Sequence, residues 1–97
     1  MADRNEQLHV SNNERASRFE CDVDGKLSVV EYQLRDGTII LTHTEVPREL
    51  GGRGIAQAIV KHALDDARAR HLRVVAQCPY VAAYIDRHPE YRDLLAA

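Results

Sequence analysis

Apolar and polar residues alternate along the stretch from residue 18 to residue 46, and this period of two predicts β-strands. In the first six residues, RFECDV, the apolar side chains fall on one face and the charged side chains on the other. Two further segments, LSVVEYQLR and TIILTHTEV, are rich in β-branched and aromatic residues, which suit a pleated sheet. An Asp-Gly pair, a frequent hairpin dipeptide, separates each segment from the next. The sequence therefore predicts an antiparallel meander of three strands.

A helical period replaces this alternation after residue 53. Apolar residues recur every three or four positions and form one broad stripe, which predicts an amphipathic helix that ends near Arg70. The stripe contains Ile55, Ala56, Ile59, Val60, Ala63, Leu64 and Ala67. LRVVAQC, residues 72–78, then indicates a buried strand, and a short helix is expected over about residues 80–87. Because a helix connects the two strands, the new strand should lie parallel to the preceding one.

The predicted element order, β-β-β-α-β-α, is that of an α/β (α+β) fold. A chain of 97 residues has room for a single core, and no repeat or low-complexity segment divides it. Residues 1–97 are therefore expected to form one domain. Residues 1–16 are polar and lack a steady period, so we expect a loosely ordered lead-in there, with one strand candidate at residues 8–10.

The composition argues against several classes of protein. No apolar run approaches the ~20 residues of a membrane helix, and a formal net charge of −2 does not favour general binding to nucleic-acid backbone. The polar N-terminus lacks the features of a signal peptide, and the spacing of Cys21 and Cys78 fits no structural metal site. A cytoplasmic protein with reduced thiols, and with no metal, membrane or nucleic-acid partner, is expected.

Three of the five glycines, Gly51, Gly52 and Gly54, stand immediately before the predicted long helix. The first N–H groups of a helix have no partner within the helix, so a turn without side chains would let a phosphate group reach them. Arg53 would add a full positive charge nearby. The spacing fits neither a P-loop nor a dinucleotide-binding fingerprint, whose third glycine is replaced by Gln57. These residues alone are compatible with a phosphate-binding turn and with a plain turn.

Several segments resemble, in the right order, the GNAT superfamily of acyl-CoA-dependent acetyltransferases. GGRGIA, residues 51–56, resembles the superfamily signature Q/R-x-x-G-x-G/A at Gly54 and Ala56, whereas Gly51 stands where the family has Gln or Arg. The pieces RF, DGK, EY, THTEVP and CPYVAAYIDRHPEY are similar to those of the very small, single-domain members of the superfamily. The resemblance extends over most of the chain from residue 18 onwards.

This resemblance implies a minimal GNAT-like fold that binds acetyl-CoA as co-substrate. In such folds the pantetheine arm lies between two diverging strands, and the pyrophosphate lies on the glycine-rich turn. By position, the backbone of Val46 would face the pantetheine arm, and the N–H groups of the turn would face the pyrophosphate. The cofactor-binding residues implied in this way are Val46, Gly51, Gly52, Arg53, Gly54, Ile55 and Ala56.

Four residues are candidates for the chemistry of acetyl transfer to an amine, which needs a base for the amine and an acid for the leaving thiolate. The resemblance implies that Glu45 is the base, directly or through water, and alternation places it with His43 on the face that also carries Ile39 and Leu41. The resemblance implies that Tyr84 is the acid.

Cys78 would be an acylated nucleophile if its pKa were lowered. His88 is a secondary candidate for contact with CoA. Each of these residues also has a plain structural interpretation. Glu45 and His43 would simply meet water at the rim of the sheet, Tyr84 and Cys78 would pack, and His88 would suit a helix C-terminus.

Three functions are compatible with these residues. The first is an acetyl-CoA-dependent N-acetyltransferase that acts on an amine of a small molecule or protein. The second is a CoA-binding regulatory module with little catalysis, because the chain lacks the early helices that wall the acceptor site in larger members. The third, a Cys-His hydrolase, needs Cys78, His43 and Glu45 to converge. A monomer or weak homodimer is expected, and the acceptor is left open.

Overall fold

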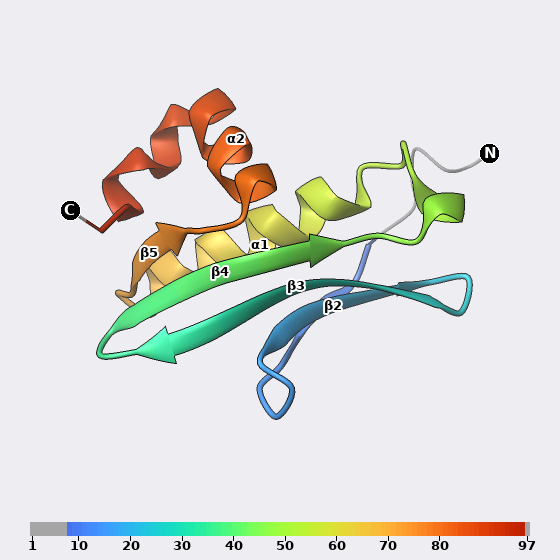
Figure 1. The fold of residues 1–97 in the computed structure, drawn as a ribbon, viewed down its shortest axis with the longest axis horizontal. Helices are drawn as coiled ribbons and strands as arrows, with labels where there is room; N and C mark the ends of the chain where they lie inside the picture. Colours follow the sequence, from blue (N-terminus) through green and yellow to red (C-terminus); the bar gives the residue numbers. More distant parts are fainter. Residues whose placement is uncertain (1–7, 97) are drawn as a thin grey trace.

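The computed structural model describes residues 8–96, which form one five-stranded sheet with helices on one of its faces (Figure 1). The strands lie in the order β1-β2-β3-β4-β5. Their bounds are Val10–Asn13, Arg18–Val23, Lys26–Arg35, Thr38–Glu45 and Arg73–Ala76. The helices are α1 at Ile55–Ala69 and α2 at Pro79–Arg87, with short 3-10 helices at Arg48–Leu50 and Pro89–Leu94. No helix within residues 8–96 is long and apolar enough to cross a membrane.

The predicted meander is confirmed, because β2, β3 and β4 pair antiparallel in sequence order. Both connecting turns have two successive residues with positive φ. Asp24 and Gly25 lie at φ 56° and 77°, and Asp36 and Gly37 lie at φ 53° and 77°. This geometry matches the right-handed twist of the flanking strands, which is why Asp-Gly pairs favour tight hairpins.

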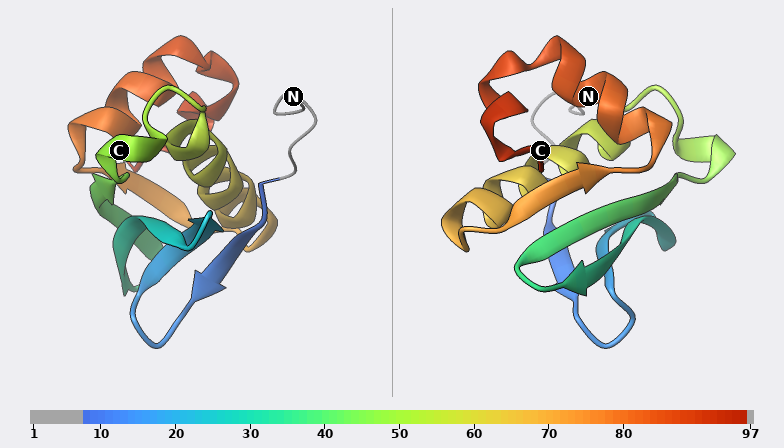
Figure 2. Two further views of the ribbon diagram at one scale, coloured as in Figure 1. Left: turned by 90° about the vertical axis from the view of Figure 1, so that its right-hand side faces the viewer. Right: turned by 60° about the vertical axis from the view of Figure 1, so that its left-hand side comes forward.

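The predicted crossover is also confirmed. Helix α1 carries the chain back along the sheet, so that β5 pairs with β4 in parallel, from Thr38 with Arg73 to Leu41 with Ala76. Helix α2 and the following 3-10 helix then pack beside α1. The views in Figure 2 show these helices on the same side of the sheet, and no helix of residues 8–96 covers the other face.

The core lies between the sheet and α1, and the alternating residues of the strands supply one side of it. Phe19 is fully buried, and its ring centroid lies 5.3 Å from that of Tyr32 and 5.7 Å from that of His62 on α1. The predicted helical stripe supplies the other side. Its fully or almost fully buried members are Ile55, Ile59, Val60, Ala63, Leu64 and Ala67.

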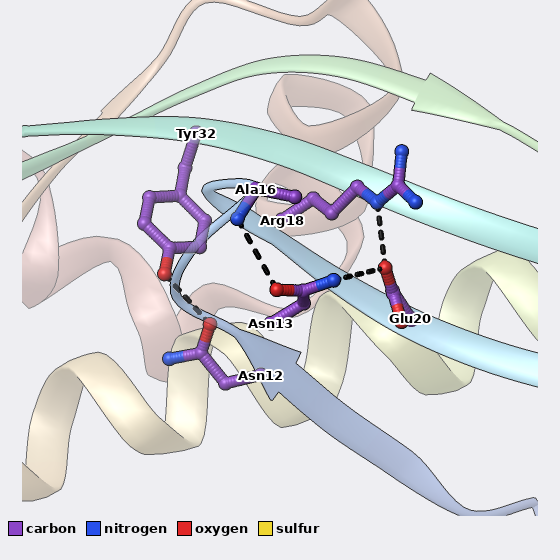
Figure 3. A network of polar contacts seen from close by, with 6 residues as sticks. All are labelled: Asn12, Asn13, Ala16, Arg18, Glu20 and Tyr32. Carbon is purple, nitrogen blue, oxygen red and sulfur yellow. Dashed lines mark hydrogen bonds and ion pairs between the residues drawn. The ribbon is translucent and has the colours of Figure 1, made fainter.

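Residues 10–13 correct the prediction of a loosely ordered lead-in over residues 1–16. They form β1, the edge strand beside β2. The strand candidate at residues 8–10 overlaps this strand only at Val10, because the other three residues of the strand are polar and show no period. Polar side chains hold it instead: Tyr32 Oη donates to Asn12 Oδ1 at 2.6 Å, and Asn13 Nδ2 donates to Glu20 Oε2 at 2.8 Å (Figure 3). The first seven residues of the predicted lead-in lie outside the described residues.

The 3-10 helix at Pro89–Leu94 is tied to α1 by polar contacts at the surface. Tyr91 Oη donates to Asp65 Oδ1 at 2.7 Å, and Arg68 pairs with Asp93 at 2.9 Å. Burial and the nearby Asp65 carboxylate raise the pKa of Tyr91, so that its hydroxyl stays protonated and keeps donating. These contacts fix α2, which carries several candidate site residues, beside α1.

Ser28 on β3 is expected to destabilise the protein. It is fully buried, and its hydroxyl is the buried side-chain oxygen that lacks a partner within the described part of the chain. A buried hydroxyl without a partner has given up its hydrogen bonds to water and gained none in the protein, which lowers the stability of the folded state. We expect Ser28→Ala to raise the free energy of unfolding by about 1 kcal/mol in urea denaturation followed by circular dichroism. Ser11→Ala, on exposed β1, should change it by less than about 0.5 kcal/mol. A destabilised Ser28→Ala protein would contradict the assignment.

Candidate functional site

Strands β4 and β5 separate after the pair formed by Leu41 and Ala76. The N–H groups of Gln77 and Cys78 both donate to the carbonyl oxygen of Leu41, at 3.1 and 2.9 Å, and these bonds end the parallel ladder. Strand β4 continues to Glu45, while the segment that follows β5 turns away into α2 (Figure 1). The end of β4 is therefore paired with β3 on one side but not with β5 on the other.

The start of α1 lies close to this opening and has no side-chain cap. Gly54 is the N-cap residue in the left-handed conformation, at φ 75°, and Gly52 lies at φ 82°. Neither an acidic side chain in the first turn nor a capping hydrogen bond satisfies the first N–H groups. A Cβ atom at either glycine would meet no atom within 4 Å, so these glycines leave open space above the turn. The turn therefore presents peptide N–H groups and the positive end of the helix dipole.

A cleft of about 420 Å³ joins the glycine turn, the end of β4 and the first turn of α2. Its lining residues are Val46, Leu50, Gly51, Gly52, Gly54, Ile55, Ala56, Gln57 and Tyr80. The structure thus brings together every predicted cofactor-binding residue except Arg53. The guanidinium of Arg53 instead forms an ion pair with Asp24 at 3.2 Å. We refer to this space below as the glycine cleft.

Three residues of the glycine cleft, Leu50, Gln57 and Tyr80, were not predicted from the sequence. In the sequence, Gln57 stands out only because it replaces the third glycine of the dinucleotide-binding fingerprint. Tyr80 is 38% exposed, although aromatic side chains of this size are usually buried more fully. Its position two residues after Cys78, where the predicted buried strand ends, was the available signal.

The prediction that His43 and Glu45 share a face of the sheet with Ile39 and Leu41 is wrong. A β-bulge shifts the register of β3 and β4 between Glu31 and Tyr32, so the alternation along β4 changes phase after Leu41. Leu41 is fully buried, whereas the side chains of His43 and Glu45 are 55% and 70% exposed. They face away from the helices, and His43 Nε2 lies 3.5 Å from Glu45 Oε1.

Thr44 takes the place on the core side that His43 was expected to occupy. It pairs with the fully buried Val30, and its hydroxyl lies 3.4 Å from the sulfur of Cys78. Cys78 therefore contacts Thr44, while His43 contacts Glu45. These contacts do not bring together the three side chains that the hydrolase hypothesis needs.

Cys78 is the N-cap residue of α2 and is 6% exposed. Burial raises the pKa of its thiol, but the hydrogen bond with Thr44 and the N–H groups of Val81 and Tyr80 lower it by more. The net result is a pKa below the usual value of a thiol. A sulfur at the start of a helix is a suitable place for a thiolate, because the helix dipole and the first N–H groups favour negative charge.

Tyr84 and His88 pack against each other on α2. Tyr84 is 6% exposed, its ring stacks on that of His88 at 4.0 Å between centroids, and it does not line the glycine cleft. Burial raises the pKa of Tyr84, and the opposing effect of Lys61 is smaller, so the phenol is protonated at neutral pH. His88 Nδ1 lies 2.8 Å from the carbonyl oxygen of Tyr84, which fixes the ring in this stack.

The arrangement suits an anionic ligand at the start of α1. Peptide N–H groups lie at one end of the glycine cleft, and the exposed edge of β4 and the thiol lie near the opening between the strands. Within the described residues, no group of three or more His, Cys, Asp or Glu side chains is placed to hold a metal ion.

Comparison with known proteins gives consistent matches. A family model described as GCN5-related N-acetyl-transferase matches residues 18–94. Protein NATD1 of Homo sapiens is 32% identical over 85 residues, which cover 84% of this chain and 75% of that protein. Protein NATD1 of Xenopus tropicalis is 29% identical over 90 residues, which cover 90% and 83%. The solution structure of a GCN5-like candidate N-acetyltransferase from Staphylococcus aureus aligns with a TM-score of 0.72 at 25% identity, covering 100% of this chain and 92% of that one.

Proposed function

The chain belongs to the GCN5-related N-acetyltransferase family, and from this premise we propose that it transfers an acetyl group from acetyl-CoA to an amine in the cytoplasm. The acceptor amine belongs to a small molecule or to a protein. Acetyl-CoA supplies the acyl group as a thioester. The residues of the chain would hold this co-substrate, exclude water from part of it and move the protons of the reaction.

One observation carries this proposal: the uncapped start of α1 faces the same cleft as the end of β4. The N–H groups at the start of α1 suit the pyrophosphate of CoA, because no side chain caps them and they lie at the positive end of the helix. The end of β4, which β5 leaves unpaired, suits the amide groups of the pantetheine arm. The open space above Gly52 and Gly54 would let a ligand approach these N–H groups closely.

The proton transfers would use the four candidate residues in one of two ways. In a direct transfer, Glu45 would accept a proton from the amine, with His43 beside it, and Tyr84 would protonate the departing CoA sulfur. In a two-step transfer, Cys78 would first accept the acetyl group on its sulfur and then release it to the amine. The lowered pKa of Cys78, and the exposure of Glu45 on the far face of the sheet, favour the second route.

A CoA-binding module with little catalysis is a second candidate, and the open face of the sheet favours it. The helices within residues 8–96 cover the other face, so His43 and Glu45 have no helical wall beside them to enclose an acceptor. Such a module would bind CoA in the same glycine cleft and would gain an acceptor site only with a partner.

Two measurements test the proposal on the unmodified chain. Acetyl-CoA at about 100 times its Kd should stabilise the protein against thermal unfolding by about 2.7 kcal/mol. Release of free CoA thiol, followed with a panel of amines that includes spermidine, arylamines and lysine peptides, should then identify an acceptor. Binding without turnover on any amine would support the module instead. Absence of binding at millimolar acetyl-CoA would contradict both functions.

A further inference from the structure

Two tyrosines one helical turn apart on α2 differ in what they contact. Tyr84 is buried against His88 and lies outside the lining of the glycine cleft. Tyr80 lines the glycine cleft and keeps 38% of its surface exposed. Within the described part of the chain, no hydrogen bond to the Tyr80 hydroxyl is found. Tyr80 therefore borders the glycine cleft with an aromatic ring that is neither fully buried in the core nor held by a hydrogen bond among the described residues.

The position of Tyr80 is fixed by its neighbours in the chain. Pro79 occupies the first position of α2, where its restricted φ is compatible with the helix, and Cys78 before it is anchored to β4 through the bond from its N–H to Leu41. Tyr80 thus lines the glycine cleft together with Gln57 and the glycine turn. Cys78, whose N–H donates to the carbonyl oxygen of Leu41 where the strands separate, is only two residues away along the chain.

We propose that Tyr80 is a ligand-contacting residue whose ring packs against the part of CoA between its pyrophosphate and its sulfur, the pantetheine arm. This inference rests on the proposed function, because it names a contact made by the proposed co-substrate. The arm consists of methylene, methyl and amide groups, which suit an aromatic face with one polar end. Burial raises the pKa of Tyr80 above its ordinary value. The phenol therefore stays neutral at physiological pH and places no negative charge beside an anionic ligand.

The ring, rather than the hydroxyl, should carry most of the affinity. Covering the exposed part of the ring removes apolar surface from water, and at the usual gain per area this corresponds to about 10- to 50-fold in affinity. We expect Tyr80→Ala to raise the Kd of CoA by this factor in calorimetric titration. Tyr80→Phe should stay within about threefold of the unmodified protein. Tyr91→Phe removes a hydroxyl from a buried tyrosine away from the glycine cleft and should leave the Kd unchanged.

ADP serves as a second probe because it carries the diphosphate without the pantetheine arm. Tyr80→Ala should bind ADP as the unmodified protein does, while its affinity for CoA falls. Equal loss of affinity for both ligands would overturn the assignment to the arm, and unchanged CoA binding would overturn the role of Tyr80 while leaving the proposed function intact. Failure of the unmodified protein to bind CoA would overturn both. Melting temperature and circular dichroism of each variant establish that it is folded, and Tyr80→Phe tests the ring where Tyr80→Ala is unstable.

Discussion

Replacing Gly52 and Gly54 together with alanine is expected to weaken acetyl-CoA binding on the order of 100-fold while the protein still folds. Each added methyl group enters the open space above the turn, which is where the ligand must approach the N–H groups of α1. A hydrogen bond to a charged group contributes about 1.5–3 kcal/mol, so the loss of one or two such bonds gives this factor. Titration calorimetry with acetyl-CoA measures it directly.

The two hairpin glycines offer a matched control. Gly25 and Gly37 both lie at φ 77°, close to the values of 82° and 75° at Gly52 and Gly54, and a Cβ atom at any of the four would meet no atom within 4 Å. Alanine at positive φ costs about 1 kcal/mol per position in each pair, because the strain is in the backbone. Both double variants should therefore lose similar stability in urea.

The two double variants should differ only in binding. If Gly25→Ala with Gly37→Ala weakens binding as much as the turn variant does, the effect comes from general destabilisation. If the turn variant binds acetyl-CoA as well as the unmodified protein, the glycine turn is not the diphosphate site, and the proposed function loses the observation that carries it.

The fold could be predicted from the sequence wherever a single period persists. The period of two along residues 18–46, broken by Asp-Gly pairs, was enough to predict the meander, and the change to a helical period predicted α1. The parallel strand followed from the crossover rule. Strand β1 could not be found in this way, because side chains such as Asn12 and Asn13, rather than an apolar face, hold it in place.

The candidate site was predicted best where it depends on the backbone. Glycines before a helix predict an open turn from local chemistry alone, and the structure has this turn. The side of the sheet on which His43 and Glu45 lie is set by a β-bulge, which adds one residue to β4. Strict alternation from Ile39 onwards assumes that no such residue is present. The place of Tyr80 in the glycine cleft depends on how α2 packs beside the separated strands. Such a tertiary contact leaves no periodic pattern in the sequence.

The pKa of Cys78 gives the second large prediction. The thiol lies at the start of α2 near the opening of the strands, with the Thr44 hydroxyl 3.4 Å from its sulfur. In the two-step route, its thiolate forms a bond to the acetyl carbon, and the bond from that carbon to the CoA sulfur breaks. The CoA sulfur leaves as a thiolate that takes up a proton. The nitrogen of the acceptor amine then bonds to the acetyl carbon, the bond from that carbon to the Cys78 sulfur breaks, and the amine gives up a proton as the Cys78 thiolate is regenerated. Each step conserves the acetyl group, so intact mass should show one acetyl group on the protein when no amine is present.

Cys78→Ala should lower turnover on the order of 1,000-fold and leave the Kd of acetyl-CoA nearly unchanged. Cys21→Ala, at the buried thiol on β2, should retain turnover. A lowered pKa means more thiolate at neutral pH, so the midpoint of alkylation by iodoacetamide should lie below that of an unperturbed thiol. Thr44→Val should move this midpoint upwards, because it removes a group that stabilises the thiolate. Undiminished turnover in Cys78→Ala would mean that the amine attacks the thioester directly, and Glu45 and Tyr84 would then be the residues to test.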